Sequence, residues 1–73
     1  MKIMMHRNKD GQYIDIDDMS DIQLISTIRI IRTIADKGFI AKGEGPLHGD
    51  DALYYMGLGN YLTELNKRGL KEI

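Results

Sequence analysis

The chain contains no cysteine in 73 residues. This absence excludes disulfide bonds and metal–thiolate sites, and it agrees with a reducing compartment. The chain also lacks a surplus of either positive or negative charge, because its formal net charge at pH 7 is only −1. Proteins that read nucleic acid or bind anionic membranes normally carry a clear basic surplus, so we expect neither nucleic acid nor a membrane as the main partner.

Long apolar runs are absent as well. No stretch approaches the roughly 18 to 20 residues that cross a bilayer, and the first residues, MKIMMHRN, become polar too soon for a signal peptide. We therefore expect a cytoplasmic protein with one domain over residues 1–73. A monomer of this size buries only about 60% of its unfolded surface. Stability is then marginal, which favours a homo-oligomer.

The strongest local signal is the start of a helix that we expect over residues 20–37. Ser20 can accept a hydrogen bond from the amide of Gln23, and the Gln23 side chain can return one to the amide of Ser20, as in a capping box. Met19 and Leu24 have the spacing of a hydrophobic staple. Together these signals predict the first turn of the helix.

The end of this helix is marked by Gly38, which suits the left-handed position after the last turn. From there Phe39 can contact Ile34, as in a Schellman motif. The alternating isoleucines also permit a strand. The run is long for a strand, however, and the two marked ends favour a helix.

The helix carries an unusually wide apolar arc. Its centre is a seam at 4-3-4 spacing made of Leu24, Ile28, Ile31 and Ala35. Thr27, Ile30 and Ile34 widen the seam on one side, while Ile22 and Ile25 lie on the other flank. One partner helix seldom covers so wide an arc, so we expect both a sheet and a second subunit against it.

Residues 2–16 are expected to form a β-hairpin, with strands at 2–7 and 12–16. The intervening Asn-Lys-Asp-Gly sequence supplies a type I turn with Gly11 at the left-handed bulge position. A lone two-stranded hairpin is barely stable. Its apolar face must therefore pack on the helices or pair with another chain.

The connection into the first helix is acidic, with Asp15, Asp17, Asp18 and Asp21. The spacing lacks the Asp-x-Asp-x-Asp-Gly pattern and the distant glutamate of a calcium loop. We interpret these carboxylates as ordinary partners of the helix dipole and expect no metal site.

Residues 39–49 are expected to be a glycine-rich connector, because they hold three glycines and the only proline, Pro46. Lys42 and His48 would suit a phosphate-binding loop. The Gly-Lys-Ser/Thr ending of a P-loop is missing, and the acidic Asp50 and Asp51 that follow would repel an anion. The segment is therefore interpreted as a mobile connector, with closure over a ligand as the alternative.

A second helix is expected over residues 50–68. Its predicted apolar face consists of Tyr54, Leu58, Tyr61, Leu62 and Leu65. Gly69 and Leu70 repeat the closing device of the first helix. Gly57 and Gly59 would lie inside the helix, where each costs about 1 kcal/mol relative to alanine. Such a cost favours close helix packing there or, as an alternative, a small-molecule pocket.

The pocket hypothesis combines several residue types. Tyrosine rings beside a glycine gap can stack on a planar base, and an arginine can bind phosphate. The candidate ligand-binding residues are Arg29, Arg32, Lys42, His48, Tyr54, Tyr55, Gly57, Gly59 and Tyr61.

Catalytic signatures are missing. Ser20 is used as a cap, Ser26 lies mid-helix, and only His6 and His48 could serve as imidazole bases. The two histidines lack the spacing of a metal-binding motif. We therefore expect no enzymatic activity, no catalytic residues and no cofactor.

Several segments carry a resemblance that covers nearly the whole chain. They are Asp10-Gly11 followed by Ile14, then Met19, Asp21, Leu24, Thr27, Ile28 and Arg29, and finally Tyr61-Leu62-x-Glu64-Leu65-x-x-Arg68-Gly69-Leu70. This arrangement resembles a group of short bacteriophage proteins of unassigned role that share a hairpin, a "DG…M-x-x-x-HL-x-N-T-I-R" helix and a terminal "EL-x-x-RGL" helix. Gln23 replaces the histidine of that pattern and Ser26 the asparagine, so a polar site made by that pair would be altered here.

The resemblance implies an infected bacterial cytoplasm, where proteins this small often act on host defence by binding. One hypothesis is a homo-oligomeric sponge that sequesters a cyclic-nucleotide signal between subunits. The alternative is an inhibitor that covers a surface of a host protein. The fold predicted from the sequence is α+β, in which an N-terminal β-hairpin precedes two antiparallel helices (ββαα) packed as a homo-oligomer.

Overall fold

A computed structural model describes residues 5–7 and 13–72 of the chain. The fold is α+β, as predicted. Its elements in chain order are β1 (Met5–Arg7), β2 (Tyr13–Asp15), the short 3-10 helix η1 (Ile16–Asp18), α1 (Asp21–Lys37), β3 (Phe39–Ala41), β4 (Gly45–Leu47), α2 (Asp50–Tyr55) and α3 (Leu58–Lys67). No helix in the described part of the chain has the length and apolar character needed to cross a membrane.

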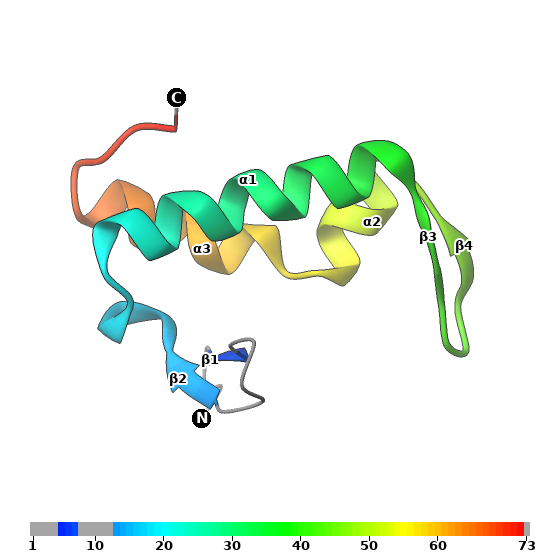
Figure 1. Cartoon of the computed structure of the whole chain (residues 1–73), viewed down its shortest axis with the longest axis horizontal. Coiled ribbons are helices and arrows are strands. Elements are labelled where there is room, and N and C mark those ends of the chain that lie inside the picture. The colour runs from blue at the N-terminus through cyan, green and yellow to red at the C-terminus, as the bar shows by residue number, and fades with distance from the viewer. Residues whose placement is uncertain (1–4, 8–12, 73) are drawn as a thin grey trace.

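The long helix α1 is the axis of the molecule. α2 and α3 both pack against it, so that the second half of the chain runs back along the first. The β1–β2 hairpin and the β3–β4 hairpin project toward opposite ends of α1 (Figure 1).

The N-terminal hairpin is present, and it is shorter than predicted. β1 and β2 pair antiparallel, with His6 opposite Ile14. The predicted second strand extends to Ile16, but this residue instead opens η1 and is almost fully buried in the core. The predicted turn at residues 8–11 lies outside the described residues.

The predicted N-cap of α1 is confirmed, but the return hydrogen bond from the Ser20 amide to the Gln23 side chain, which would complete the capping box, is not formed between these two described residues. The amide of Gln23 donates to Oγ of Ser20 at 3.1 Å, and both Met19 and Leu24 are buried. The predicted Schellman ending is wrong. Gly38 has the positive φ expected of it, 85°, but its ψ of 160° directs the chain into an extended strand instead of a closing turn.

The prediction of an irregular connector over residues 39–49 is also wrong. Phe39 pairs with Leu47 and Ala41 with Gly45, which makes this segment an antiparallel hairpin, β3–β4. Gly43 in the turn and Gly45 at the start of β4 take φ values of 85° and 80°, which L-residues with side chains rarely adopt. The glycines interpreted as linker residues therefore allow a tight reversal between two strands.

The predicted helix over residues 50–68 is two helices. Gly57 takes a left-handed conformation, with φ 73° and ψ 33°, and separates α2 from α3. The break changes which residues face the core. Leu58, Tyr61 and Leu65 are buried as predicted, whereas Tyr54 is 90% exposed because α2 no longer continues the line of α3.

The C-terminal end of α3 follows the prediction. The amide of Leu70 donates to the carbonyl of Leu65 and that of Gly69 to the carbonyl of Asn66, both at 3.0 Å. These two bonds with a left-handed Gly69 form a Schellman motif, and Leu70 packs against the core as expected.

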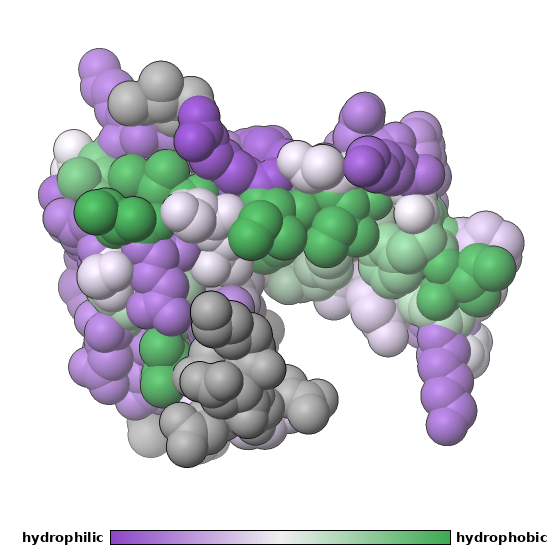
Figure 2. Space-filling model, in the orientation of Figure 1, coloured by the Kyte–Doolittle hydropathy of each residue, from purple (hydrophilic) through white to green (hydrophobic). Residues whose placement is uncertain are grey.

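The core lies between α1 and α3 and is closed by η1. It is built from eight buried side chains of the described residues: Ile16, Met19, Leu24, Ile28, Ile31, Leu58, Tyr61 and Leu65. The predicted seam of α1 is therefore covered by the rest of its own chain. The flank beside it is not, since Ile30 is 57% and Ile34 39% exposed. Figure 2 shows apolar surface along α1 that continues toward the end carrying the β3–β4 hairpin.

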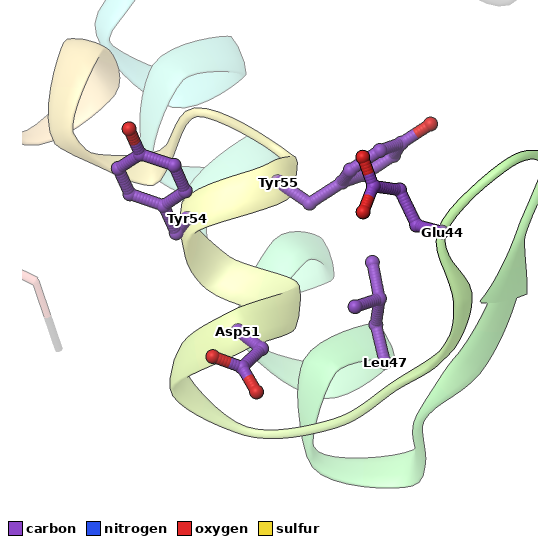
Figure 3. A pocket seen from close by; sticks show the side chains of 5 residues that line it. All are labelled: Glu44, Leu47, Asp51, Tyr54 and Tyr55. Atoms are coloured by element: carbon purple, nitrogen blue, oxygen red, sulfur yellow. The ribbon is translucent and has the colours of Figure 1, made fainter.

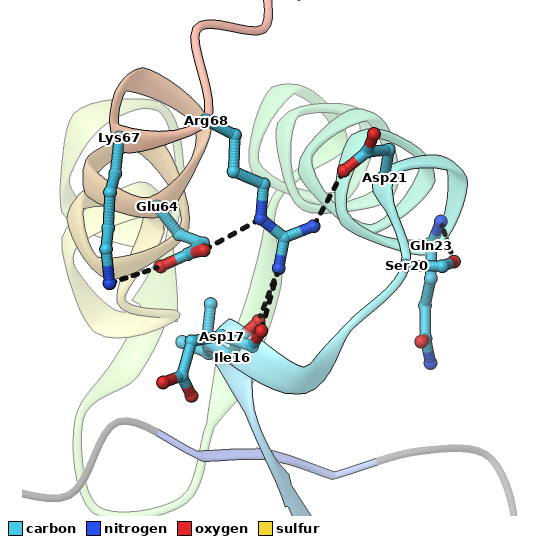
Figure 4. A network of polar contacts seen from close by, with 8 residues as sticks. All are labelled: Ile16, Asp17, Ser20, Asp21, Gln23, Glu64, Lys67 and Arg68. Carbon is cyan, nitrogen blue, oxygen red and sulfur yellow. Dashed lines mark hydrogen bonds and ion pairs between the residues drawn. The ribbon is translucent and has the colours of Figure 1, made fainter.

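Arg68 joins three elements at one end of the core (Figure 4). Its Nε donates to Oε2 of Glu64 at 2.7 Å, and its Nη1 donates to Oδ1 of Asp21 at 3.0 Å. Its Nη2 donates to the carbonyls of Ile16 and Asp17. One guanidinium thus links α3 to α1 and to η1.

Candidate functional site

A candidate site is a pocket between α2 and the β3–β4 hairpin, with a volume of about 530 Å³ (Figure 3). This volume is within the range of small-ligand pockets. The residues that line it are Glu44, Leu47, Asp51, Tyr54 and Tyr55. Three come from α2 and two from the hairpin, so the pocket exists only because these two segments lie side by side.

Local structure explains how the lining is arranged. Asp51 and Tyr54 are three residues apart on α2, which places them on neighbouring turns of the same side. Glu44 lies in the turn of the hairpin, where its amide donates to the carbonyl of Ala41 at 3.1 Å. Leu47 is on β4 and supplies the apolar part of the wall. Figure 3 shows Glu44 approaching from the hairpin and Asp51 from the helix.

The hairpin is tied to the helices at both of its ends. The ring of Phe39 contacts the ring of Tyr55, with the centroids 5.8 Å apart. The amide of Gly49 donates to the carbonyl of Ala35 in α1 at 2.9 Å. These contacts hold the hairpin beside α2 and keep the pocket open between them.

The electrostatic character of the pocket is acidic. Two of its five lining residues are carboxylic acids and none is a lysine, arginine or histidine. The other polar groups are two tyrosines, whose ring faces carry partial negative charge. Such a lining attracts cations and disfavours phosphate groups.

A smaller hollow of about 290 Å³ is lined by Tyr54, Gly57, Gly59 and Asn60. The structure thus brings together one tyrosine and the two glycines of the predicted glycine gap. The left-handed Gly57 and the side-chain-free Gly59 leave this hollow open, and Tyr54 borders both depressions.

The cationic residues predicted to bind phosphate lie outside the lining of both depressions. Arg32 on α1 is paired with Glu72, and its Nη2 donates to Oε2 at 2.7 Å. This hydrogen bond raises the pKa of Arg32 and lowers the pKa of Glu72. Arg29 is exposed on α1, and Lys42 is exposed in the turn of the β3–β4 hairpin. His48 is exposed just after β4.

Tyr61 was predicted to stack on a ligand, but it is buried in the core. Its hydroxyl lies 2.9 Å from Nδ1 of His6, and the two rings meet edge to face. Burial raises the pKa of Tyr61 and lowers the pKa of His6. The pair fastens β1 to α3, which is a structural role that the sequence spacing of 55 residues does not reveal.

Glu44, Leu47 and Asp51 were missed as site residues by the sequence analysis. Glu44 looked like part of a linker, and Asp51 looked like an ordinary helix-start carboxylate. The one available signal was the pair of tyrosines that follows Asp51 by one helical turn. Only the pairing of β3 with β4 brings Glu44 to the same pocket.

Asp15, Asp17 and Asp18 also gather, with carboxylate oxygens within 4.8 Å of one another. All three residues are exposed. Acidic groups are common beside a helix start, where they interact favourably with the helix dipole. Their grouping alone does not define a metal site.

Comparisons with protein-family models, with curated proteins and with solved structures give no match to this chain.

Proposed function

We propose that this protein is a non-catalytic binding protein that captures a lysine or arginine side chain of a partner protein in the pocket between α2 and the β3–β4 hairpin. The observation that carries the proposal is the placement of Glu44 and Asp51 on two different elements around one tyrosine-lined pocket. The two carboxylates make the pocket attractive to a cationic head group, whose aliphatic stem can pack on Leu47 and the rings.

The lining also supports binding over catalysis. Glu44 and Asp51 are exposed residues, whereas catalytic carboxylates generally occupy desolvated positions beside a second reactive group. Aromatic residues next to a charged anchor site are typical of the energetic centres of protein interfaces. If the resemblance to short bacteriophage proteins holds, the partner would be a protein of the infected bacterium.

A cyclic-nucleotide sponge is the competing proposal. Tyr54 and Tyr55 could stack on a base at the pocket, but the two carboxylates there would repel the phosphates. Of the two arginines expected to bind them, Arg32 is engaged by Glu72, and Arg29 lies outside the pocket lining. These observations favour the cationic ligand.

The proposal is tested by NMR titration of the full chain with acetyl-Gly-Arg-Gly-amide. The matched peptide carries citrulline, which keeps the shape of arginine but removes its charge. We expect the arginine peptide to bind with a dissociation constant of about 1 mM, with amide shifts centred on Glu44, Asp51 and Tyr55. Equal shifts with the citrulline peptide, or no shifts with either, would contradict the proposal.

Charge removal gives a second arm of the same experiment. The double variant Glu44→Gln/Asp51→Asn should weaken arginine-peptide binding by about three- to tenfold, the effect of losing two exposed ion pairs. Asp36→Asn is the control: Asp36 is an exposed residue of α1 outside the pocket, so the variant should leave binding unchanged. A thermal-shift measurement with cyclic dinucleotides completes the set, because a clear rise in Tm there would favour the sponge.

A further inference from the structure

A second regular seam runs along α1 beside the buried one. Its members follow a 4-3-4-3 spacing, the repeat that packs one helix along another. They are Gln23, Thr27, Ile30, Ile34 and Lys37. The buried seam of α1 is already covered by α2, α3 and η1, but Ile30 and Ile34 on the second seam stay exposed.

The charges of α1 are distributed unevenly around this second seam. At 100° per residue, Arg29, Arg32 and Asp36 project from the opposite flank of the helix. From Gln23 to Ile34 the second seam itself holds no charged residue. Two exposed isoleucines on a stretch without charge, flanked by the half-buried Gln23 and Thr27, resemble the charge-depleted centre of a protein interface. In Figure 2 the apolar surface follows α1 for much of its length.

We infer that this second seam binds a second copy of the chain, with the two α1 helices packed antiparallel about a twofold axis near Ile30. A twofold interface uses the same surface on both subunits, so the seam must be complementary to itself. In the antiparallel arrangement, Ile30 faces its own copy and Ile34 lies near Thr27 of the partner subunit. The aliphatic residues then cover one another.

The ends of the seam set the orientation. A parallel arrangement would place Lys37 beside Lys37 of the partner subunit, and like charges at that spacing repel. The antiparallel arrangement places Lys37 beside Gln23 of the partner subunit instead. Antiparallel helices also set the positive end of each helix dipole beside the negative end of the other. The pocket lining shares no residue with the second seam, so the dimer and the binding function are tested independently.

The dimer is tested by sedimentation equilibrium of the full chain over a range of concentrations. We expect a reversible dimer, and we expect Ile30→Glu and Ile34→Glu each to raise the dissociation constant at least about tenfold. Ile22→Glu is the matched control: Ile22 is more exposed, at 80%, but lies off the seam. Its dimer should be unchanged. Far-UV circular dichroism establishes that each variant is folded.

Orientation is tested with single cysteines, since the natural chain has none. Under mild oxidation Ile30→Cys should form disulfide-linked dimers, and a mixture of Gln23→Cys with Lys37→Cys should cross-link across the interface. Lys37→Cys alone should not. Cross-linking by Lys37→Cys alone would overturn the antiparallel arrangement. A strict monomer at every concentration, or a dimer insensitive to Ile30→Glu, would overturn the interface itself.

Discussion

Nε of Arg68 donates a hydrogen bond to Oε2 of Glu64 at 2.7 Å, in the contact region between α3, α1 and η1 that we call the Arg68 joint. Glu64 is buried, and it is also 3.9 Å from the ammonium of Lys67, which is largely exposed. The Arg68 guanidinium therefore provides the close partner for the buried charge, and its hydrogen bonds raise its own pKa. The remaining Arg68 donors serve two backbone carbonyls and Asp21.

The first prediction concerns this joint. Arg68→Met should lower Tm clearly, because it leaves a buried carboxylate without its guanidinium and frees η1 from α3. Arg29→Met, an exposed arginine on α1, is the control and should change the free energy of unfolding by no more than about 0.5 kcal/mol. Adding Glu64→Leu to Arg68→Met should recover part of the loss. Equal Tm values for Arg68→Met and Arg29→Met would show that the joint contributes little.

The second prediction compares two glycines. Gly57→Ala should destabilise the protein by about 1–2 kcal/mol, since its φ of 73° strains a side-chain-bearing residue. Gly59→Ala should stabilise it by about 0.5–1 kcal/mol, because Gly59 is helical and nothing lies within 4 Å of an added Cβ. Urea denaturation measures both. A stabilising effect of Gly57→Ala would mean that α2 and α3 can join into one helix.

The third prediction is a pH dependence that arises from His6. Burial lowers the pKa of His6 below its ordinary value of 6.5, so the unfolded chain takes up the proton more readily than the folded one. The stability that the buried, neutral His6 provides is fully present above pH 6.5 and is lost as the pH falls through the lowered pKa. Urea midpoints of the wild type should therefore decline over that interval.

The matched control for this effect is the other histidine. His6→Gln should flatten the decline and loosen the contact with Tyr61, whereas His48→Gln should leave the profile unchanged. His48 is exposed and has no core partner among the described residues. A decline that survives His6→Gln would assign the pH dependence to other groups.

The fourth prediction concerns the ion pair between Arg32 and Glu72. Both side chains are partly exposed, so Glu72→Gln should cost only about 0.2–1 kcal/mol, and added salt should reduce this cost. Because Arg32 lowers the pKa of Glu72, the contribution is present above the ordinary value of 4.5 and fades as the pH falls below it. Asp36→Asn, at a similar net charge, is the control. A large loss that is independent of salt would show that the pair does more than hold the end of the chain.

The sequence by itself determined the features that depend on neighbours within one or two helical turns. These features are the cap at Ser20, the Schellman motif at Gly69 and the buried seam of α1. The first two depend on hydrogen bonds between residues at most five positions apart, and the seam depends on the spacing of apolar residues along one helix face. Such contacts form wherever the same short sequence pattern occurs, so the sequence predicts these three features correctly. Gly38 was the exception, because pairing between β3 and β4 overrode the local preference for a closing turn.

Only the tertiary structure decided which residues form the candidate binding site. Glycines at 43 and 45 are equally compatible with a linker or a strand reversal, and Gly57 with a helix interior or a break, until long-range packing selects one. That selection exposed Tyr54, buried Tyr61 against His6, and placed Glu44 and Asp51 around one pocket. Side chains distant in sequence meet because burial of the whole core lowers the free energy of the folded state. Local sequence patterns do not contain this long-range information.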